Sequence, residues 1–293
     1  MYEIIPLTKN NLYEFKKLND LKNKFNEINK DFFEICDNKN PFQKFLEKRK
    51  IKLLKKDSCY IGYIWSENVK KSIYRIQSMF VINRNSNTLL EEYKLLLDSI
   101  NGYSKLYYDC VKNSFNHKVL NTLSFIRSKG FLEMSLDLSD ININPFDKPD
   151  YVSFKKVLIG HDEELRCFIQ NAIFQSKDRI PLEPRDIYYD EIQDYYFGKG
   201  AILIKYGDNY IGYGQIILRN GTPYIVNFGI IQEFREKGYG KILLSYLLNI
   251  LKENNYNKVN IHVDFNNYSA IKLYKYFGFE IKKETYTWVL NRL

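Results

Sequence analysis

An internal repeat is the feature that most limits what this chain can fold into. The tetrapeptide YIGY at 60–63 returns at 210–213, an offset of 150 residues. The dipeptide GF at 130–131 returns at 278–279, an offset of 148 residues. Two anchors with nearly the same offset indicate two copies of one fold. A chain of 293 residues is also long enough for two domains that each bury their own core.

Each copy is predicted to form an α/β (α+β) domain around one sheet. In the second copy the hydrophobic periodicity predicts strands at 151–159, 200–218 (a hairpin), 222–231, 258–265 and 286–291, and helices at 162–174, 184–197, 240–255 and 268–278. Strands mixed with helices in this way pack as layers around one core. The segment 140–150 is polar, with two prolines and no periodicity. It is the expected linker between domains at 1–142 and 150–293.

Composition argues against several classes of protein. The net charge is +9, but the basic residues are scattered, so no nucleic-acid partner is expected. No apolar run approaches the ~18 residues of a membrane span, and the N-terminus shows no secretory pattern. Cys36, Cys59, Cys110 and Cys167 lie too far apart for a metal or redox motif. We therefore expect a cytoplasmic protein with no membrane partner and no metal site.

A charged, glycine-containing corner occupies residues 235–241, between a predicted strand and a predicted helix. The first amides of a helix have no intrahelical partner and lie at the positive end of its dipole. Gly238 and Gly240 let a ligand approach those amides, and Arg235 and Lys237 add positive charge. Such a corner suits a pyrophosphate. The alternative is a corner that only connects strand to helix.

A second motif follows in NNYSAIKLYKYFGF, residues 266–279. Asn267, Ala270, Tyr274 and the dipeptide 278–279 have the form Asn-x-x-Ala-x-x-x-Tyr-x-x-x-Gly-Phe. With the corner, this motif resembles the GNAT superfamily, the GCN5-related N-acetyltransferases, over about residues 224–280. The resemblance implies two tandem GNAT domains, each a mixed, mostly antiparallel sheet flanked by helices. It also implies acetyl-CoA as the acyl donor.

The resemblance assigns roles to particular positions. The strand before the corner would pair with pantetheine through its main chain, the corner amides would bind the pyrophosphate, and an asparagine would contact the cofactor arm. These cofactor-binding positions are Phe228, Gly229, Ile230, Arg235, Glu236, Lys237, Gly238, Tyr239, Gly240, Lys241 and Asn267. Tyr274 would protonate the departing CoA thiolate. A phenol can supply this proton because its pKa is only about 1.5 units above that of a thiol.

One position departs from the family pattern. Many members carry a glutamate as general base on the strand before the corner, and Tyr224 stands there in this chain. We include Tyr224 among the catalytic positions with its role open. The amine can instead lose its proton to water or to a nearby side chain, for which the candidates are Asp190, Glu191, Asp264 and His262. His262 can equally be a packed, hydrogen-bonded strand residue.

The first copy departs much further from the pattern. At an offset of 148 residues, the corner's counterparts are Asn87, Leu90 and Glu92, with no glycine, and Ile126 replaces the tyrosine. We therefore predict a degenerate GNAT-like domain without an intact CoA loop. The layout is similar to that of mycothiol synthase-like proteins, a similarity that does not transfer the acceptor.

These motifs predict an acetyl-CoA-dependent N-acetyltransferase that transfers an acetyl group directly, in a ternary complex, to the primary amine of a small molecule. A peptide amine is the second choice of acceptor. The tyrosine-rich stretch 180–197 is acidic enough to suit a cationic amine, although a solvated helix face explains it equally well. Because the glutamate base is missing, the alternative is a CoA-binding sensor or scaffold without catalysis.

Overall fold

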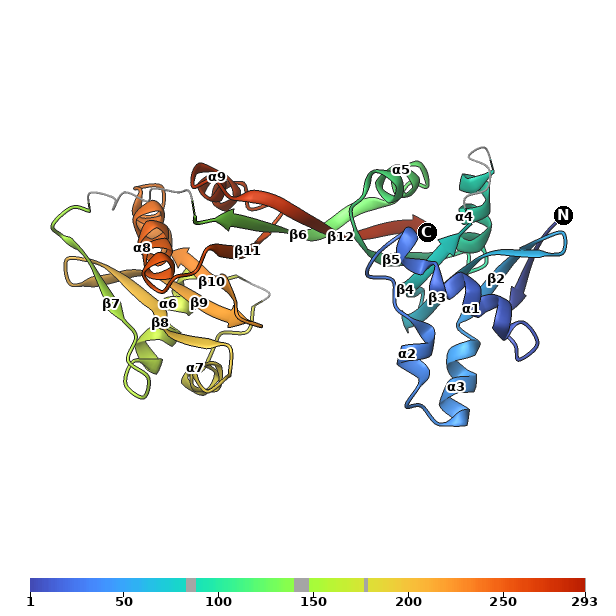
Figure 1. The fold of residues 1–293 in the computed structure, drawn as a ribbon, viewed down its shortest axis with the longest axis horizontal. Helices are drawn as coiled ribbons and strands as arrows, with labels where there is room; N and C mark the ends of the chain where they lie inside the picture. Colours follow the sequence, from blue (N-terminus) through green and yellow to red (C-terminus); the bar gives the residue numbers. More distant parts are fainter. Residues whose placement is uncertain (83–87, 140–147, 177–178, 293) are drawn as a thin grey trace. The chain divides into compact units, whose positions relative to one another are not determined.

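The computed structural model describes residues 1–82, 88–139, 148–176 and 179–292 (Figure 1). It comprises two compact units. Unit 1 consists of Met1–Phe131 and Lys283–Leu293, and unit 2 consists of Leu132–Lys282. Among the described helices, none is both long and apolar enough to cross a bilayer. Asn87 and most of the expected linker lie outside the described residues.

Unit 1 contains the first copy of the repeat. Its elements are β1 (Tyr2–Pro6), α1 (Leu12–Asp20), η1 (Lys22–Lys24), α2 (Phe32–Cys36), α3 (Pro41–Lys48), β2 (Ile51–Lys56), β3 (Cys59–Lys70), β4 (Ile73–Val81), α4 (Leu89–Asp98), β5 (Ser104–Val111), α5 (Ser114–Thr122) and the start of β6 (Ile126–Asp137). Strands β1 to β4 pair antiparallel in chain order, and β5 pairs parallel with β4. Leu90 and Glu92, the counterparts of the corner, lie in the first turn of α4.

Unit 2 repeats this order of elements. They are β7 (Val152–Lys156), α6 (Glu163–Ile173), α7 (Pro184–Glu191), β8 (Tyr196–Tyr206), β9 (Asn209–Arg219), β10 (Thr222–Ile230), η2 (Gln232–Phe234), α8 (Tyr239–Glu253), β11 (Lys258–Asp264), α9 (Tyr268–Tyr276) and the start of β12 (Glu280–Arg292). Strands β7 to β10 pair antiparallel, and β11 pairs parallel with β10. The predicted fold class, an α/β fold with a mixed sheet flanked by helices, is confirmed.

The sheet of unit 2 is buried on both faces because its side chains alternate. On β8, Ala201 and Leu203 pack with Ile169 and Ile173 of α6. Their neighbours Ile202 and Ile204 belong to the cluster that contains the leucines of α8. Figure 1 shows α8, in orange, lying against these strands. Successive side chains of a strand point to opposite faces of the sheet, so alternate residues of β8 pack against different helices.

Strand β10 has an irregularity where it will matter for the site. Its register with β9 shifts between Val226 and Gly229, and Asn227 adopts a left-handed conformation with φ 49°. Its parallel pairing with β11 comprises Tyr224 with Asn260 and Ile225 with Ile261. A β-bulge bends its strand and redirects side chains. Beyond the paired residues, both strands line a cavity.

The last strand of each repeat belongs to the unit formed by the other repeat. From Thr285 to Arg292, β12 pairs antiparallel with β5 of unit 1. Conversely, Leu132, Met134 and Leu136 of β6 are buried in the main core of unit 2. The sequence had placed both strands within their own halves, 1–142 and 150–293. The two units are therefore not two contiguous halves of the chain.

Candidate functional site

A groove of about 780 Å³ in unit 2 runs along the end of β10, the start of α8 and α9. Most of the positions predicted to bind the cofactor line it together with the predicted proton donor. These are Phe228, Gly229, Ile230, Arg235, Glu236, Gly238, Gly240, Lys241, Asn267 and Tyr274. Sequence reasoning missed Ser269, Lys272 and Tyr276, which line the same groove from α9. They lie between the positions that define the motif, where the pattern carries no signal.

The backbone of residues 236–240 forms a concave turn at the start of α8. Glu236 has φ 61°, and Gly238, the N-cap, has φ 87°. Within the described part of the chain, no acceptor is bonded to the amides of residues 236–240. Left-handed residues that alternate with right-handed ones gather successive N–H groups into an anion-binding hollow. The helix dipole adds to the positive potential there.

The two basic side chains of the corner, Arg235 and Lys237, donate hydrogen bonds to main-chain carbonyls and so hold the loop in shape. Arg235 donates from Nε to the carbonyl of Ile230 at 2.8 Å and from Nη2 to the carbonyl of Ile173 at 2.7 Å. It therefore ties the corner to the ends of β10 and α6. Lys237 donates to the carbonyl of Glu233 at 2.9 Å and is absent from the groove lining.

Two other predicted positions differ in how their side chains are used. The side chain of Tyr239 is 8% exposed and packs in the core against Phe234 and Tyr206, so only its amide faces the corner. The Lys241 ammonium lies 3.9 Å from the ring centroid of Tyr276 while lining the groove. Tyr239 therefore supports the corner, whereas Lys241 offers a positive charge to a ligand.

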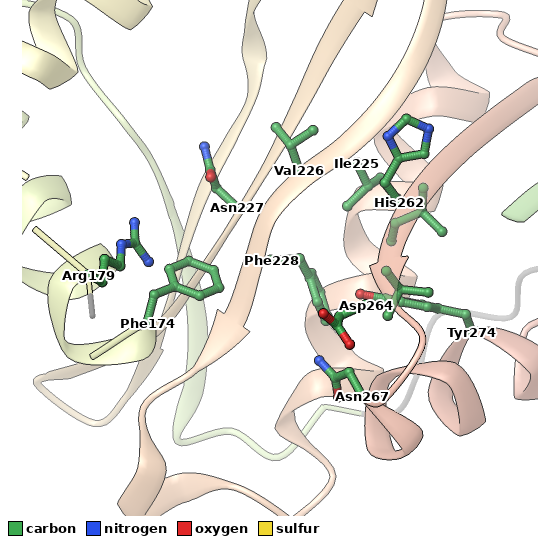
Figure 2. Close-up of a pocket in the computed structure, with 12 residues that line it drawn as sticks. Phe174, Arg179, Ile225, Val226, Asn227, Phe228, His262, Asp264, Asn267 and Tyr274 are labelled. Atoms are coloured by element: carbon green, nitrogen blue, oxygen red, sulfur yellow. The ribbon is translucent and has the colours of Figure 1, made fainter. Parts of the chain in front are cut away.

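A smaller cavity of about 220 Å³ lies where β10 and β11 diverge (Figure 2). Phe174, Phe228, Asn267 and Tyr274 line both this cavity and the groove, so the two are adjacent and share these side chains as a wall.

Tyr274 lies at the junction of the groove and the cavity. Its side chain is 4% exposed, and its ring packs between Phe228 and Phe279. Burial raises the pKa of its hydroxyl well above the usual value of a tyrosine. Within the described residues that hydroxyl makes no hydrogen bond. Tyr274 therefore stays protonated and has a proton to donate.

Asn267 begins α9 and also lies at the junction. Its Oδ1 accepts from the amide of Ala270 at 3.1 Å, which is the N-cap bond of the helix. The cap fixes the side chain where it lines both cavities. The motif asparagine thus has a structural reason for its position as well as access to a ligand.

Two of the four candidate proton acceptors line the smaller cavity, His262 and Asp264. His262 Nε2 lies 3.4 Å from Oε2 of Glu133 on β6. Sequence reasoning missed Glu133 because it belongs to the other repeat. The ring of Tyr224 lies 5.5 Å from the ring of His262, and Tyr224 lines neither the cavity nor the groove.

The other two candidate acceptors, Asp190 and Glu191, are held in a buried network. Arg166, 1% exposed, forms ion pairs with both carboxylates and donates to Gln215 Oε1 at 2.9 Å. Gln215 in turn accepts from Asn227 at 2.9 Å, which fixes the bulge of β10. Burial raises the pKa of Glu191. Neither carboxylate lines the groove or the smaller cavity, so their contacts support the strands around the site.

The segment after α6 contributes residues that no motif marked. Phe174 and Arg179 line the smaller cavity, and both also line a neighbouring hollow of about 390 Å³. The Arg179 guanidinium lies 4.9 Å from the centroid of the Phe174 ring. In the described ranges, no group of three or more His, Cys, Asp or Glu side chains could hold a metal ion.

One comparison with known proteins covers the part of the chain that contains the site. The sequence model of the acetyltransferase (GNAT) family matches residues 168–279. The probable N-acetyltransferase san of Drosophila melanogaster is 38% identical over 66 residues, which are 22% of this chain and 36% of that protein. N-alpha-acetyltransferase 50 of Danio rerio is 39% identical over 59 residues, 20% of this chain and 35% of that protein. The chain spans about a third of the length of these curated relatives.

Solved structures resemble the whole chain. A GCN5-related N-acetyltransferase from Sphaerobacter thermophilus has a TM-score of 0.57 at 12% identity, covering 99% of this chain and 96% of that one. A GNAT-family acetyltransferase from Colwellia psychrerythraea has a TM-score of 0.52 at 12% identity, covering 99% of this chain and all of that one, 100%. At this identity the likeness concerns the fold, and it extends over both units.

Proposed function

We propose that this chain is an acetyl-CoA-dependent N-acetyltransferase with its active site in unit 2. The match of residues 168–279 to the acetyltransferase (GNAT) family model supports the proposal. The proposed acceptor is the primary amine of a small molecule. The observation that carries the proposal is that the groove and the smaller cavity share one wall, which includes Tyr274. The main-chain anion site of the groove and the histidine of the cavity therefore lie on either side of a buried acid.

The residues around the groove fit the proposed donor. The unpartnered amides of residues 236–240 suit a pyrophosphate, and Lys241 adds a positive charge. Gly229 lets the backbone of β10 lie close to the side chain of Ile173. Any larger residue would clash there, since a Cβ at this position would lie 2.2 Å from that side chain. When bound, acetyl-CoA supplies an activated acetyl group as a thioester. The chain supplies binding, orientation and proton transfer.

Tyr274 is proposed as the general acid. Its hydroxyl reaches the junction without a hydrogen-bond partner among the described residues, and burial raises its pKa, so the resting site holds it protonated. Because the same shift makes the phenol a weaker acid than a free tyrosine, the proton is transferred as the thiolate departs rather than before. A positioned acid of this kind typically contributes about 10² to 10⁴ in rate.

His262 is proposed as the group that accepts the proton of the amine. Its imidazole lines the smaller cavity, and Oε2 of Glu133 lies 3.4 Å from Nε2, where the carboxylate can hold the ring in place. Tyr224, at the usual position of the glutamate, contacts the His262 ring and would orient it. This division of roles gives the site a base without a carboxylate at 224.

The proposal has one alternative acceptor and one alternative function. The zebrafish relative is named for acetylation of an α-amine, so a peptide amino terminus is a second class of acceptor. A sensor or scaffold that binds CoA without turnover is the alternative function, motivated by Tyr224. Amine-dependent release of CoA thiol separates an enzyme from a sensor.

Donor binding is tested by thermal unfolding with Gly238→Glu and a matched control. Ligand that binds the native state raises the melting temperature. Gly238 and Gly160 have φ of 87° and 81°, and a Cβ at either meets nothing within 4 Å, but Gly160 is absent from the groove lining. Gly238→Glu and the control Gly160→Glu should lose similar stability. Only Gly238→Glu should lose the rise in melting temperature caused by acetyl-CoA. Equal shifts in both variants would reject the corner as the donor site.

A further inference from the structure

Arg179 places a positive charge at one side of the smaller cavity. Its guanidinium is held over the ring of Phe174 at 4.9 Å, and both residues line the cavity. Figure 2 shows this pair across the hollow from His262 and Asp264. Stacking on an aromatic face holds the planar fork of an arginine in place and leaves its N–H groups free to bind an anion.

No carboxylate in the described part of the chain forms an ion pair with Arg179. Two other arginines of unit 2 have internal partners. Arg166 is paired with two carboxylates, and Arg235 donates to two main-chain carbonyls. A half-buried cation that lines a cavity and has no carboxylate partner among the described residues is a candidate site for a ligand's negative charge.

The opposite side of the cavity carries the complementary charge. Asp264 lines it, and His262 is backed by Glu133. The cavity is therefore dipolar: one side suits an ammonium group or an amine about to react, and the other suits an oxyanion. A small zwitterion matches both sides, whereas a second ammonium group would lie beside a guanidinium and be repelled.

We propose that the acceptor is a small primary amine that also carries an anionic group, a carboxylate or a phosphate, and that Arg179 binds this group. The inference rests on the proposed function, because it names the acceptor of the same site. Bidentate pairing of a guanidinium with either oxyanion has the same geometry. Arg179 sets acceptor specificity and takes no part in proton transfer.

The acidic stretch 180–197 does not supply the rival site for a cationic amine. Asp186 accepts from the amide of Glu183 at 2.8 Å as part of a helix cap. Asp190 and Glu191 are paired with Arg166. None of these three carboxylates lines the described cavities around the site. Each of the three carboxylates already has a partner within the protein.

The donor's phosphates are also a poor match for Arg179. The groove that contains the corner amides is lined by Phe174 but not by Arg179. Arg179 instead lines the smaller cavity and the neighbouring hollow on the side of α6. Its charge therefore acts on the acceptor rather than on the donor.

The test compares acceptors that differ only in the anionic group. Amino acids are compared with their carboxamides, and phosphoethanolamine with ethanolamine, so that the two arms separate a carboxylate from a phosphate. Thiol release gives kcat and KM for wild type, Arg179→Gln, Arg179→Lys and the control Arg185→Gln. Arg185 is exposed, pairs with Glu183 and lines none of these cavities.

We expect one anionic acceptor to exceed its neutral partner in kcat/KM by about tenfold or more in wild type, the size of a charged hydrogen bond. Arg179→Gln should remove this preference by raising KM with little change in kcat. Arg179→Lys should restore part of it, and Arg185→Gln should leave it intact. The melting-temperature shift caused by acetyl-CoA should be the same in all four proteins.

Three results would overturn the proposal. They are equal activity on anionic and neutral acceptors in wild type, an equal loss on both in Arg179→Gln, or loss of the acetyl-CoA shift in that variant. The stability of the CoA complex is measured with each amine in parallel. If no amine is turned over but an anionic amine stabilises this complex only when Arg179 is present, the enzyme assignment fails and the anion site stands. If no amine does either, both fail.

Discussion

At the scale of single residues, the site depends on the protonated hydroxyl of Tyr274 and on the orientation of His262. The buried Tyr274 hydroxyl keeps its proton because burial raises its pKa. His262 has a carboxylate beside it on the cavity wall. The sequence motif identified Tyr274, and the sequence also offered His262 as one of four candidate proton acceptors. The sequence could not choose among these four, because Glu133, which lies beside His262, belongs to the other repeat.

Replacing Tyr274 with phenylalanine should lower kcat by roughly a hundredfold or more, since the general acid is lost while the ring remains. The acetyl-CoA melting-temperature shift should persist. Steady-state kinetics and thermal unfolding measure the two effects. Tyr268→Phe is the control, because Tyr268 begins the same helix, is 74% exposed and lines no cavity around the site. Full activity of Tyr274→Phe would exclude the proposed acid.

Replacing His262 with asparagine should lower kcat by a similar factor without loss of donor binding, because the amine then lacks its proton acceptor. The control is His161→Asn, an exposed turn residue that lines none of the cavities around the site. The same kinetic assay reports both. If His262→Asn keeps wild-type turnover, then the proton leaves through water or through Asp264.

At the scale of elements, the sequence pattern predicts a helix or strand correctly where the segment has a single periodicity. It fails where pairing with a strand distant in sequence determines the secondary structure. The strand, corner and helix at 222–255 were predicted because an apolar alternation gives way to glycines and then to a helical repeat. The helix predicted at 184–197 ends at Glu191, since Tyr196 instead pairs with Ile217 on β9. Pairing with a distant strand overrides local preference, and no local pattern records it.

The cap of α2 gives a prediction about pH. Burial alone would raise the pKa of Asp31, but hydrogen bonds from Lys22, Asn19 and the helix amides hold it below its usual value. A lowered folded pKa adds stability above the unfolded pKa of about 3.9, and this stability is lost as pH falls through the folded value.

Thermal unfolding between neutral pH and about pH 3 checks this, with Asp31→Asn as the comparison because asparagine also caps helices. The melting temperature of wild type should fall more steeply below about pH 4 than that of Asp31→Asn. Parallel curves for the two proteins would show that the carboxylate contributes nothing to the acid response.

At the scale of the whole molecule, the repeat predicted two copies of one fold, and the structure adds that their last strands are exchanged. The repeat could not reveal this, because an exchanged strand and an unexchanged one have the same sequence. The assignment of unit 1 as a degenerate copy stays a prediction. It rests on Leu90, Glu92 and Ile126, which replace the glycines and the tyrosine of the second copy.

Replacing Trp288 with alanine should therefore destabilise unit 1, although the residue lies near the end of the second repeat. Trp288 is 1% exposed, pairs with Tyr108 of β5 and packs against His117. Removal of a buried tryptophan costs about 3 to 5 kcal/mol. Hydrogen exchange should show protection lost first in β5. Loss confined to residues 150–282 would contradict the strand exchange.

The central claim is that unit 2 transfers an acetyl group from acetyl-CoA to an amine, and direct detection of product tests it most closely. Wild-type protein is incubated with acetyl-CoA and a panel of amines, and CoA release is compared with acetylated amine measured by mass spectrometry. The account predicts one acetylated amine for each CoA released, with both abolished in Gly238→Glu. Binding of acetyl-CoA with no acetylated amine from any member of the panel would contradict it and favour a sensor.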